Sequence, residues 1–363
     1  MGTTQKQFDH ANGNYILDIH GPKKALKKLW NISNFEASAA PLVYEGILYI
    51  SKSGSFYAMN PETGNIIWEY IIPREATMPV FFENILIFGG KSLDNHVYAI
   101  DKNSGQELWK YRTSTENATV QNVPVIFDDS VYLLAGKRIH CLDFRTGKKQ
   151  WSFDLKKRTG YKNLIITSDR IYAVTDEGYD KQELHCVDNN KQELLWKIKT
   201  PNLGSNLLHI EGHLFYLNKD AELVNINLET REIVKSKIVE LKFRTHELHL
   251  SYYQGIMIIV IGSGIYGLNM MTNPWSWQWT FYAGSDIGKS VLSDNMIYFS
   301  SIWNGVYGLD FYTGKQILHI KSDVRSSLVC GVHDAAIFVA GSMNEYELTA
   351  YGEGSKQNKF FLK

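Results

Sequence analysis

The sequence of 363 residues has few cysteines, no net charge and no long apolar run. Its three cysteines, Cys141, Cys186 and Cys330, are an odd number, which excludes a fully paired disulfide framework within one chain. Lysine plus arginine equals aspartate plus glutamate at 38 each, so no global field points to nucleic acid or to an anionic membrane. No stretch approaches the roughly 18 consecutive apolar residues of a transmembrane helix. We therefore expect a soluble protein without a membrane span.

The N-terminal segment MGTTQKQFDHANGN lacks the apolar core of a secretory signal. Lys6 stands where a myristoylation motif needs Ser or Thr. If the chain is complete, these features and the unpaired cysteines predict a cytoplasmic protein, because thiols stay reduced there. A periplasmic location would require that a leader has been removed.

What the sequence does contain is a repeat. Eight times an Asn, Asp or Gly ends a short apolar strand, and a bulky residue, most often Trp, follows eight positions later. The pairs are Asn60/Trp68, Asp101/Trp109, Asp143/Trp151, Asp188/Trp196, Asn227/Lys235, Asn269/Trp277, Asp310/Leu318 and Gly352/Phe360. Units that recur at roughly 39 to 45 residues indicate a tandem array whose modules cannot bury their apolar faces alone.

Each unit reads as four strands with no amphipathic helix between them. Two apolar strands are joined by a tight turn such as Glu45-Gly46, and a third strand ends in a second turn that carries Gly in four units, for example Gly64. The fourth strand carries the Trp. This pattern predicts an all-β fold, an eight-bladed β-propeller of four-stranded antiparallel blades, with seven blades as the fallback.

The ring has to close without an open sheet edge. We expect residues 25–33, which contain Trp30, to supply the outer strand of the last blade and to pair with residues 325–351. The C-terminal tail KFFLK competes for the same place. The predicted organisation is an N-terminal extension over residues 1–24 and a single, monomeric propeller domain over residues 25–363.

A column of small residues stands before each second turn. Seven of its eight members are small, and two are cysteines, so we interpret both thiols as packing residues and not as metal or redox centres. The column is Ala58, Ala99, Cys141, Cys186, Asn225, Gly267, Gly308 and Ala350.

The segment YAMNPETGNIIW, from Tyr57 to Trp68, resembles the tryptophan-docking repeat of PQQ-like propellers, and YAIDKNSGQELW and HCLDFRTGKKQW repeat it. The resemblance implies a propeller in which each docking Trp lies against the neighbouring blade. It assigns that role to Trp68, Trp109, Trp151, Trp196 and Trp277. Lys235 and Leu318 break the pattern, so looser junctions are expected there.

Members of the family divide into quinone-dependent dehydrogenases and non-catalytic scaffolds, including a lipoprotein of outer-membrane β-barrel assembly. This chain is shorter than the dehydrogenases and lacks the adjacent cysteine pair that many of them carry. It also lacks the lipobox of the assembly lipoprotein. The resemblance therefore favours the non-enzymatic branch, without a cofactor.

Candidate chemical groups do not assemble into a catalytic or metal site. His246 and His249 lie three apart, and on a strand such residues face opposite sides. His140 and His185 occupy a repeat column otherwise held by Tyr, which favours packing. The segments GSGIYG and GGKS resemble phosphate loops in composition, but neither opens a helix. We predict no catalytic residue, bound cofactor or metal.

The loops that join one blade to the next should crowd one face of the ring, around the mouth of the channel. Convergent charges on a rigid rim can recognise a partner. We predict a non-catalytic scaffold that binds a protein there, with two alternatives: a toxin-neutralising immunity protein, or an enzyme that binds a small polar ligand or quinone at the channel mouth. The candidate contact residues are Arg74, Glu116, Arg158, Lys162, Arg244, His246, Asp286, Lys289, Trp303, Asp323 and Arg325.

Overall fold

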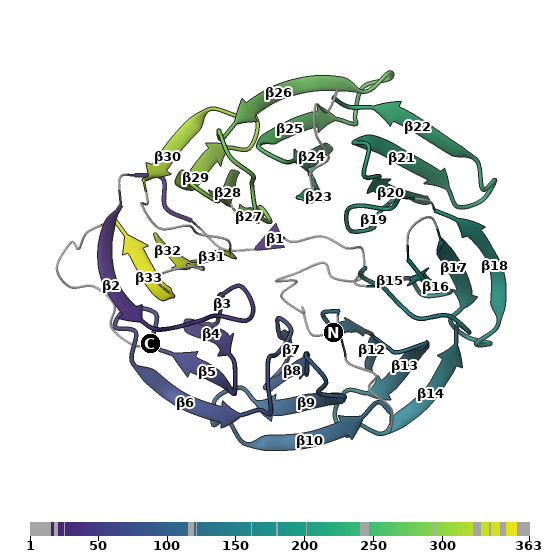
Figure 1. Cartoon of the computed structure of the whole chain (residues 1–363), viewed down its shortest axis with the longest axis horizontal. Coiled ribbons are helices and arrows are strands. Elements are labelled where there is room, and N and C mark those ends of the chain that lie inside the picture. The colour runs from purple at the N-terminus through teal and green to yellow at the C-terminus, as the bar shows by residue number, and fades with distance from the viewer. Residues whose placement is uncertain are drawn as a thin grey trace.

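Four-stranded antiparallel sheets follow one another along the chain and close into a ring of eight blades (Figure 1). The description rests on a computed structural model. It covers residues 16–17, 21–24, 26–114, 120, 122–160, 162–178, 181–200, 202–239, 247–293, 295–321, 328–333, 335–341 and 346–353, with the backbone alone for 16–17, 328–331 and 333. The predicted eight-bladed propeller is confirmed.

The first four blades each run from an inner to an outer strand. Their strands are β3 (Leu42–Tyr44), β4 (Ile47–Lys52), β5 (Ser55–Met59) and β6 (Ile66–Ile71); β7 (Val80–Phe82), β8 (Ile85–Gly89), β9 (His96–Asp101) and β10 (Glu107–Arg112); β11 (Val125–Phe127), β12 (Ser130–Ala135), β13 (Arg138–Asp143) and β14 (Lys149–Asp154); β15 (Ile165–Ile166), β16 (Arg170–Asp176), β17 (Gln182–Asp188) and β18 (Leu194–Lys199).

The other four blades continue the ring, and the last one takes its outer strand from the N-terminal part of the chain. Their strands are β19 (Leu208–Ile210), β20 (His213–Leu217), β21 (Glu222–Asn227) and β22 (Ile233–Lys237); β23 (Leu248–Tyr253), β24 (Ile256–Ile261), β25 (Gly264–Asn269) and β26 (Ser276–Tyr282); β27 (Val291–Ser293), β28 (Met296–Ser301), β29 (Gly305–Asp310) and β30 (Gln316–Ile320); β31 (Leu328–His333), β32 (Ala336–Ala340), β33 (Glu347–Gly352) and β2 (Lys27–Ser33).

The closure agrees with the expectation from the sequence. Strand β2 pairs antiparallel with β33, and Trp30 lies opposite Ala350. Phe360, the competing residue in the tail, lies outside the described residues. Strand β1 (Ile16–Leu17) also pairs parallel with β27 and forms the inner edge of the seventh blade (Figure 1). The division at residue 25 stays a prediction.

Buried apolar side chains lie between the blades. Val80 and Ile87 of the second blade, for example, share one cluster with Val131 and Leu133 of the third. Similar clusters join each neighbouring pair of blades. Since each blade buries its faces against its neighbours, the ring is a continuous core that is divided into layers.

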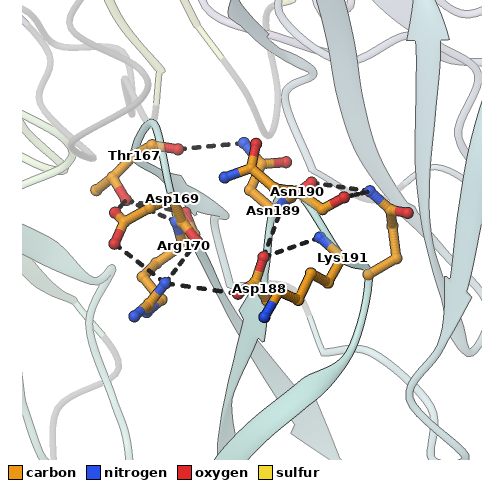
Figure 2. Close-up of polar contacts among 8 residues, drawn as sticks. Thr167, Asp169, Arg170, Asp188, Asn189, Asn190 and Lys191 are labelled. Carbon is orange, nitrogen blue, oxygen red and sulfur yellow. Dashed lines mark hydrogen bonds and ion pairs between the residues drawn. The ribbon is translucent and has the colours of Figure 1, made fainter.

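The recurring Asn or Asp holds the turn between the third and fourth strands. Its side-chain oxygen accepts backbone N–H groups two and three residues later, which is the local bonding that favours Asx residues in turns. Figure 2 shows this for Asp188, whose Oδ1 accepts from Asn190 and Lys191, both at 2.9 Å. Arg170 reaches the same carboxylate at 3.8 Å from the neighbouring hairpin.

The small column and the Trp column face each other within a blade. Ala58 and Ala99, both fully buried, lie opposite Trp68 and Trp109. Cys141 and Cys186 are buried free thiols opposite Trp151 and Trp196, which confirms their packing role. The side chain of Cys330 lies outside the described residues.

Four indole rings reach the following blade. Each N–H donates to a turn carbonyl of that blade, and each ring lies over the glycine that ends the turn. The pairs are Trp30 with Pro61 and Gly64, Trp68 with Lys102 and Gly105, Trp109 with Phe144 and Gly147, and Trp279 with Phe311 and Gly314.

The assignment of Trp277 to this column is wrong. Trp279 lies opposite Gly267 and is 8% exposed, whereas Trp277 lies opposite Leu268 and is 48% exposed. The turn before β26 is two residues longer than in the other blades, which shifts the eight-residue spacing. A bulge between the two Trp residues also interrupts the regular alternation of side chains between the two faces of this strand.

Lys235 does not lie in the column either. In the other outer strands a bulge precedes the column residue. Strands β21 and β22 pair without such a shift, so Val234 and not Lys235 lies opposite Asn225. Trp275 from the next blade approaches Phe215 at a ring distance of 5.7 Å and covers part of this junction. Leu318 keeps its column position opposite Gly308 and is buried. Looser packing at these two junctions stays a prediction.

Candidate functional site

The ring has two unlike faces. We call the one formed by the connections between blades, together with the loops joining second and third strands, the loop face. The opposite one, formed by the hairpin turns, is the turn face. Within the described residues, each connection is fastened to the next blade by its backbone, as where Asp176 N–H donates to the carbonyl of Arg158 at 2.9 Å and Ile302 N–H donates to that of Asp286 at 2.9 Å. The side chains at these positions are therefore presented by a rigid frame.

Several predicted contact residues are exposed on the loop face. Arg74, Arg158, Asp286 and Lys289 are exposed, and Lys162 is half-buried. The remaining predicted residues lie outside the described part of the chain, namely Glu116, Arg244, His246, Asp323 and Arg325.

Trp303 is a large aromatic side chain that the loop face offers to solvent. It is 63% exposed, and its backbone N–H donates to Ser285 Oγ at 3.0 Å. Ser285 Oγ also approaches Ser301 Oγ at 2.6 Å, and Asn304 Nδ2 donates to the carbonyl of Ala283 at 2.6 Å. Because these bonds fix the loop, the indole is held out on an ordered backbone beside Asp286.

The predicted residues come from several blades. Trp303 and Asp286 belong to the seventh blade, where the N–H of Ile302 donates to the carbonyl of Asp286 at 2.9 Å. Lys162 and Lys289 come from the fourth and seventh blades, and the charge of Lys289 contributes to lowering the pKa of Lys162. Arg74 and Arg158 belong to the connections that precede the second and fourth blades.

Lys219 and the buried His249, which were not among the predicted contact residues, also act electrostatically with Lys162. The pKa of Lys162 is lowered to about 8, chiefly by burial, with smaller contributions from the charges of Lys219 and Lys289. Burial lowers the pKa of His249 to about 3, and Lys289 and Lys162 act in the same direction. Lys219 lies in the loop between β20 and β21, the class of loop that also carries Trp303 between β28 and β29.

The histidines that had been interpreted as packing residues are buried. His140 Nδ1 lies 3.1 Å from Tyr111 Oη, and burial lowers the pKa of His140 to about 4. His185 Nε2 lies 3.1 Å from Thr175 Oγ1. Among the residues that the structure describes, no three His, Cys, Asp or Glu side chains are grouped so as to hold a metal ion.

No helix in the described ranges has the length and apolar character needed to cross a membrane.

Residues 25–237, more than half of the chain, match the model of the family described as outer membrane protein assembly factor BamB. The chain belongs to this family. The assembly factor BamB from Yersinia pestis is 30% identical over 213 residues, which make up 51% of this chain and 52% of that protein. A quinohemoprotein alcohol dehydrogenase from Comamonas testosteroni is 29% identical over 173 residues, 41% of this chain and 23% of that protein. The chain thus spans about half, or less, of the length of these relatives.

Solved structures show the same fold. BamB from Moraxella catarrhalis superposes with a TM-score of 0.64 at 13% identity, covering 90% of this chain and 99% of that one. The Comamonas testosteroni dehydrogenase superposes with a TM-score of 0.70 at 13% identity, covering 98% of this chain and 81% of that one. Since both branches share the fold, these superpositions do not distinguish a scaffold from an enzyme.

The family corrects one expectation from the sequence. The cytoplasmic location inferred from the N-terminal segment is contradicted, because the family model and the Yersinia pestis relative are both described as factors of outer membrane protein assembly. The N-terminal composition was a poor guide to location. The narrower idea of an immunity protein gains no support from these matches.

Proposed function

We propose that this protein is a non-catalytic scaffold that binds a protein partner during outer membrane protein assembly. The observation that carries the proposal is the family match over residues 25–237. The relatives named as assembly factors supply the process, and the fold supplies a rigid ring whose loops are free for contact. Neither the partner nor the oligomeric state follows from them.

We place the contact on the loop face, with Trp303 as its anchor. Trp is enriched among residues that dominate binding energy, and a side chain held on an ordered loop loses little entropy on binding. Arg74, Arg158 and Asp286 are exposed charges in blade connections on the same face, and they would set orientation and association rate more than affinity.

A capture experiment tests this proposal. The tagged protein and its Trp303→Ala variant are mixed with detergent-solubilised outer membrane proteins of the source organism, and bound proteins are identified by mass spectrometry. We expect the wild type to retain a component of outer membrane protein assembly, and the variant to retain at least about tenfold less, since anchor residues contribute about 2 kcal/mol or more. Trp277→Ala is the matched control, an exposed Trp on an outer strand.

The second candidate function is quinone-dependent oxidation, which the similarity to the Comamonas testosteroni dehydrogenase supports. The described residues offer no group that fits the metal such an enzyme would need beside a quinone, so we derive no catalytic step. An absorbance spectrum and metal analysis of the purified protein separate the two functions. A bound chromophore with stoichiometric metal would favour the enzyme over the scaffold.

A further inference from the structure

Two segments on the loop face of the seventh blade are hydrogen-bonded to each other. One is the connection between β26 and β27, which carries Asp286, and the other is the loop between β28 and β29, which carries Trp303. The N–H of Ile302 donates to the carbonyl of Asp286 at 2.9 Å, and the N–H of Trp303 donates to Ser285 Oγ at 3.0 Å. Trp303 and Asp286 therefore occupy neighbouring positions on one frame.

The pairing of the two segments sets the spacing of these positions. Ile287 bridges antiparallel to Ser301, so Asp286 lies opposite Ile302, and Trp303 is one residue further along. Residues at or next to opposite positions on paired segments have Cβ atoms within about 8 Å of each other. One side chain of a partner can therefore reach an indole at position 303 and a carboxylate at position 286 together.

The loop that carries Trp303 is also held from the other side. The carbonyl of Asn304 lies 2.7 Å from His319 Nε2, and the ring of His319 stacks on Tyr307 with the ring centroids 4.2 Å apart. Gly284 leaves room for the Asn304 amide, since a Cβ on Gly284 would lie 2.9 Å from Asn304 Nδ2. Because the residues on both sides of Trp303 are fixed, little backbone freedom is lost when its indole binds a partner.

The side chains of Trp303 and Asp286 offer complementary chemistry to a cation. The indole is 63% exposed, and the side chain of Asp286 is exposed as well. Among the described residues, none donates a hydrogen bond to the carboxylate of Asp286 or forms an ion pair with it, Lys289 of the same connection included. The face of an indole attracts a cation through its quadrupole, and a carboxylate attracts it by charge.

A guanidinium group suits both partners at once. It is planar, so it stacks on an indole, and its paired N–H groups match the two oxygens of a carboxylate. A lysine ammonium is a compact, strongly hydrated charge without a flat face to stack. The combination of an indole and a carboxylate therefore favours arginine over lysine.

We propose that Trp303 and Asp286 together bind an arginine side chain of the protein partner. The inference rests on the proposed function only for the source of the arginine. An indole alone also fits an apolar side chain, so the carboxylate of Asp286 is the group that makes the site selective for a cation.

The test is a fluorine NMR titration of the whole chain carrying fluorotryptophan, in which the Trp303 signal is identified by its absence from Trp303→Phe. The ligands are N-acetyl-arginine methylamide and its lysine and citrulline analogues, of which citrulline has the shape of arginine without the charge. We expect the arginine compound to shift the Trp303 signal saturably and the lysine compound to bind at least about threefold more weakly. The citrulline compound should give no saturable shift.

Asp286→Asn separates the joint site from the indole alone. The substitution keeps the backbone bond to Ile302 and removes the charge, so the arginine compound should bind about fivefold more weakly. Asp129→Asn is the matched control, because Asp129 is an exposed aspartate on the turn face, and it should bind as the wild type does.

Three results would overturn the proposal. They are a Trp303 signal that does not respond saturably to the arginine compound, a lysine or citrulline compound that binds as tightly as arginine, and an Asp286→Asn variant that binds arginine as the wild type does.

Failure of the arginine site can be told from failure of the proposed function, because the titration requires no partner and the capture experiment requires one. A protein that captures an assembly component through Trp303 but does not bind the arginine compound keeps the scaffold function and loses the arginine site. A protein that binds the arginine compound through Trp303 and Asp286 but captures no assembly component keeps the arginine chemistry and loses the partner.

Discussion

The indole ring of Trp68 lies directly on the α-carbon of Gly105 in the next blade, so closely that a Cβ on Gly105 would be 2.8 Å from the ring. The indole N–H donates to the carbonyl of Lys102 in the same turn, at 3.0 Å. Gly105 has a φ of 73°, a conformation that L side chains rarely adopt. The glycine of the turn therefore meets two requirements at once, a backbone angle and a contact surface for the neighbouring blade.

Gly105→Ala separates these two requirements when it is compared with Gly46→Ala. Gly46 has a similar φ of 75° but nothing within 4 Å of its would-be Cβ. We expect Gly46→Ala to lower the free energy of unfolding by about 1 kcal/mol through backbone strain alone. Gly105→Ala should lower it by about 1 to 3 kcal/mol more, because the methyl group displaces Trp68. Denaturant unfolding measures both, and equal losses would contradict the contact.

Gln192 replaces the turn glycine in the fourth blade, with a φ of 55°. Its side-chain amide donates to the carbonyl of Asn189 at 3.0 Å, the position at which other blades receive an indole N–H, and Trp151 is only half-buried. Asn189 and its neighbours are drawn in Figure 2. We expect Gln192→Gly to raise the free energy of unfolding by about 1 kcal/mol and to shift Trp151 fluorescence to shorter wavelength.

The reverse change, Gly147→Gln, is the control for Gln192→Gly. It should destabilise the protein by more than about 2 kcal/mol, since a Cβ at Gly147 would lie 2.5 Å from Trp109. If Gln192→Gly leaves both the stability and the emission spectrum unchanged, Gln192 does not keep the indole of Trp151 from the carbonyl of Asn189.

Trp279→Phe and Trp277→Phe test the corrected assignment in the sixth blade. Trp279→Phe leaves the carbonyl of Phe311 without its indole donor in a buried place and should lower the free energy of unfolding by about 1 to 3 kcal/mol. Trp277→Phe should change it by less than about 0.5 kcal/mol, because that ring is half-exposed. The opposite order in chemical denaturation would restore Trp277 to the docking column.

His140 should make stability depend on pH. Burial lowers its pKa to about 4, whereas an unfolded histidine has a pKa near 6.5. Its contribution is complete above about pH 6.5 and is lost as the pH falls toward 4, because over this range the unfolded chain binds a proton that the folded chain does not. The expected slope is at most about 1.4 kcal/mol per pH unit.

His140→Tyr is the variant that checks this, since Tyr57, Tyr98, Tyr266 and Tyr307 hold the same column. Its unfolding free energy, measured by denaturant titration between pH 4 and 7, should fall less steeply than that of the wild type. His249 adds a second contribution that extends to about pH 3 and is common to both proteins. Parallel curves would mean that the fold does not lower the pKa of His140.

The sequence predicts the fold well because the residues of the repeat act through interactions within a single blade. Asp101 or Asp143 closes a turn through its own side chain, a small residue such as Ala99 faces the Trp, and the Gly of the turn fits its backbone angle. Each of these signals acts within one blade and recurs in most of them. The closing strand around Trp30 was predictable because one blade would otherwise lack its outer strand.

The wrong assignments to the Trp column arose because the eight-residue spacing in the sequence does not show turn length or bulges. A turn two residues longer placed Trp279 where Trp277 was expected, and a missing bulge moved Lys235 out of the column. The influence of Lys219 on the pKa of Lys162 could not be predicted, because the two residues come from different blades that only the folded ring brings together. Such a meeting leaves no trace in the local sequence.

The most direct test of the scaffold function places a photo-cross-linking residue on each face of the seventh blade. In cells, p-benzoylphenylalanine replaces Trp303 on the loop face or Tyr312 on the turn face, both of which are exposed in the free protein. Cross-linked products are identified by mass spectrometry. We predict that position 303 cross-links to a component of outer membrane protein assembly and that position 312 does not. Cross-linking to such a component at 312 alone would contradict the proposal.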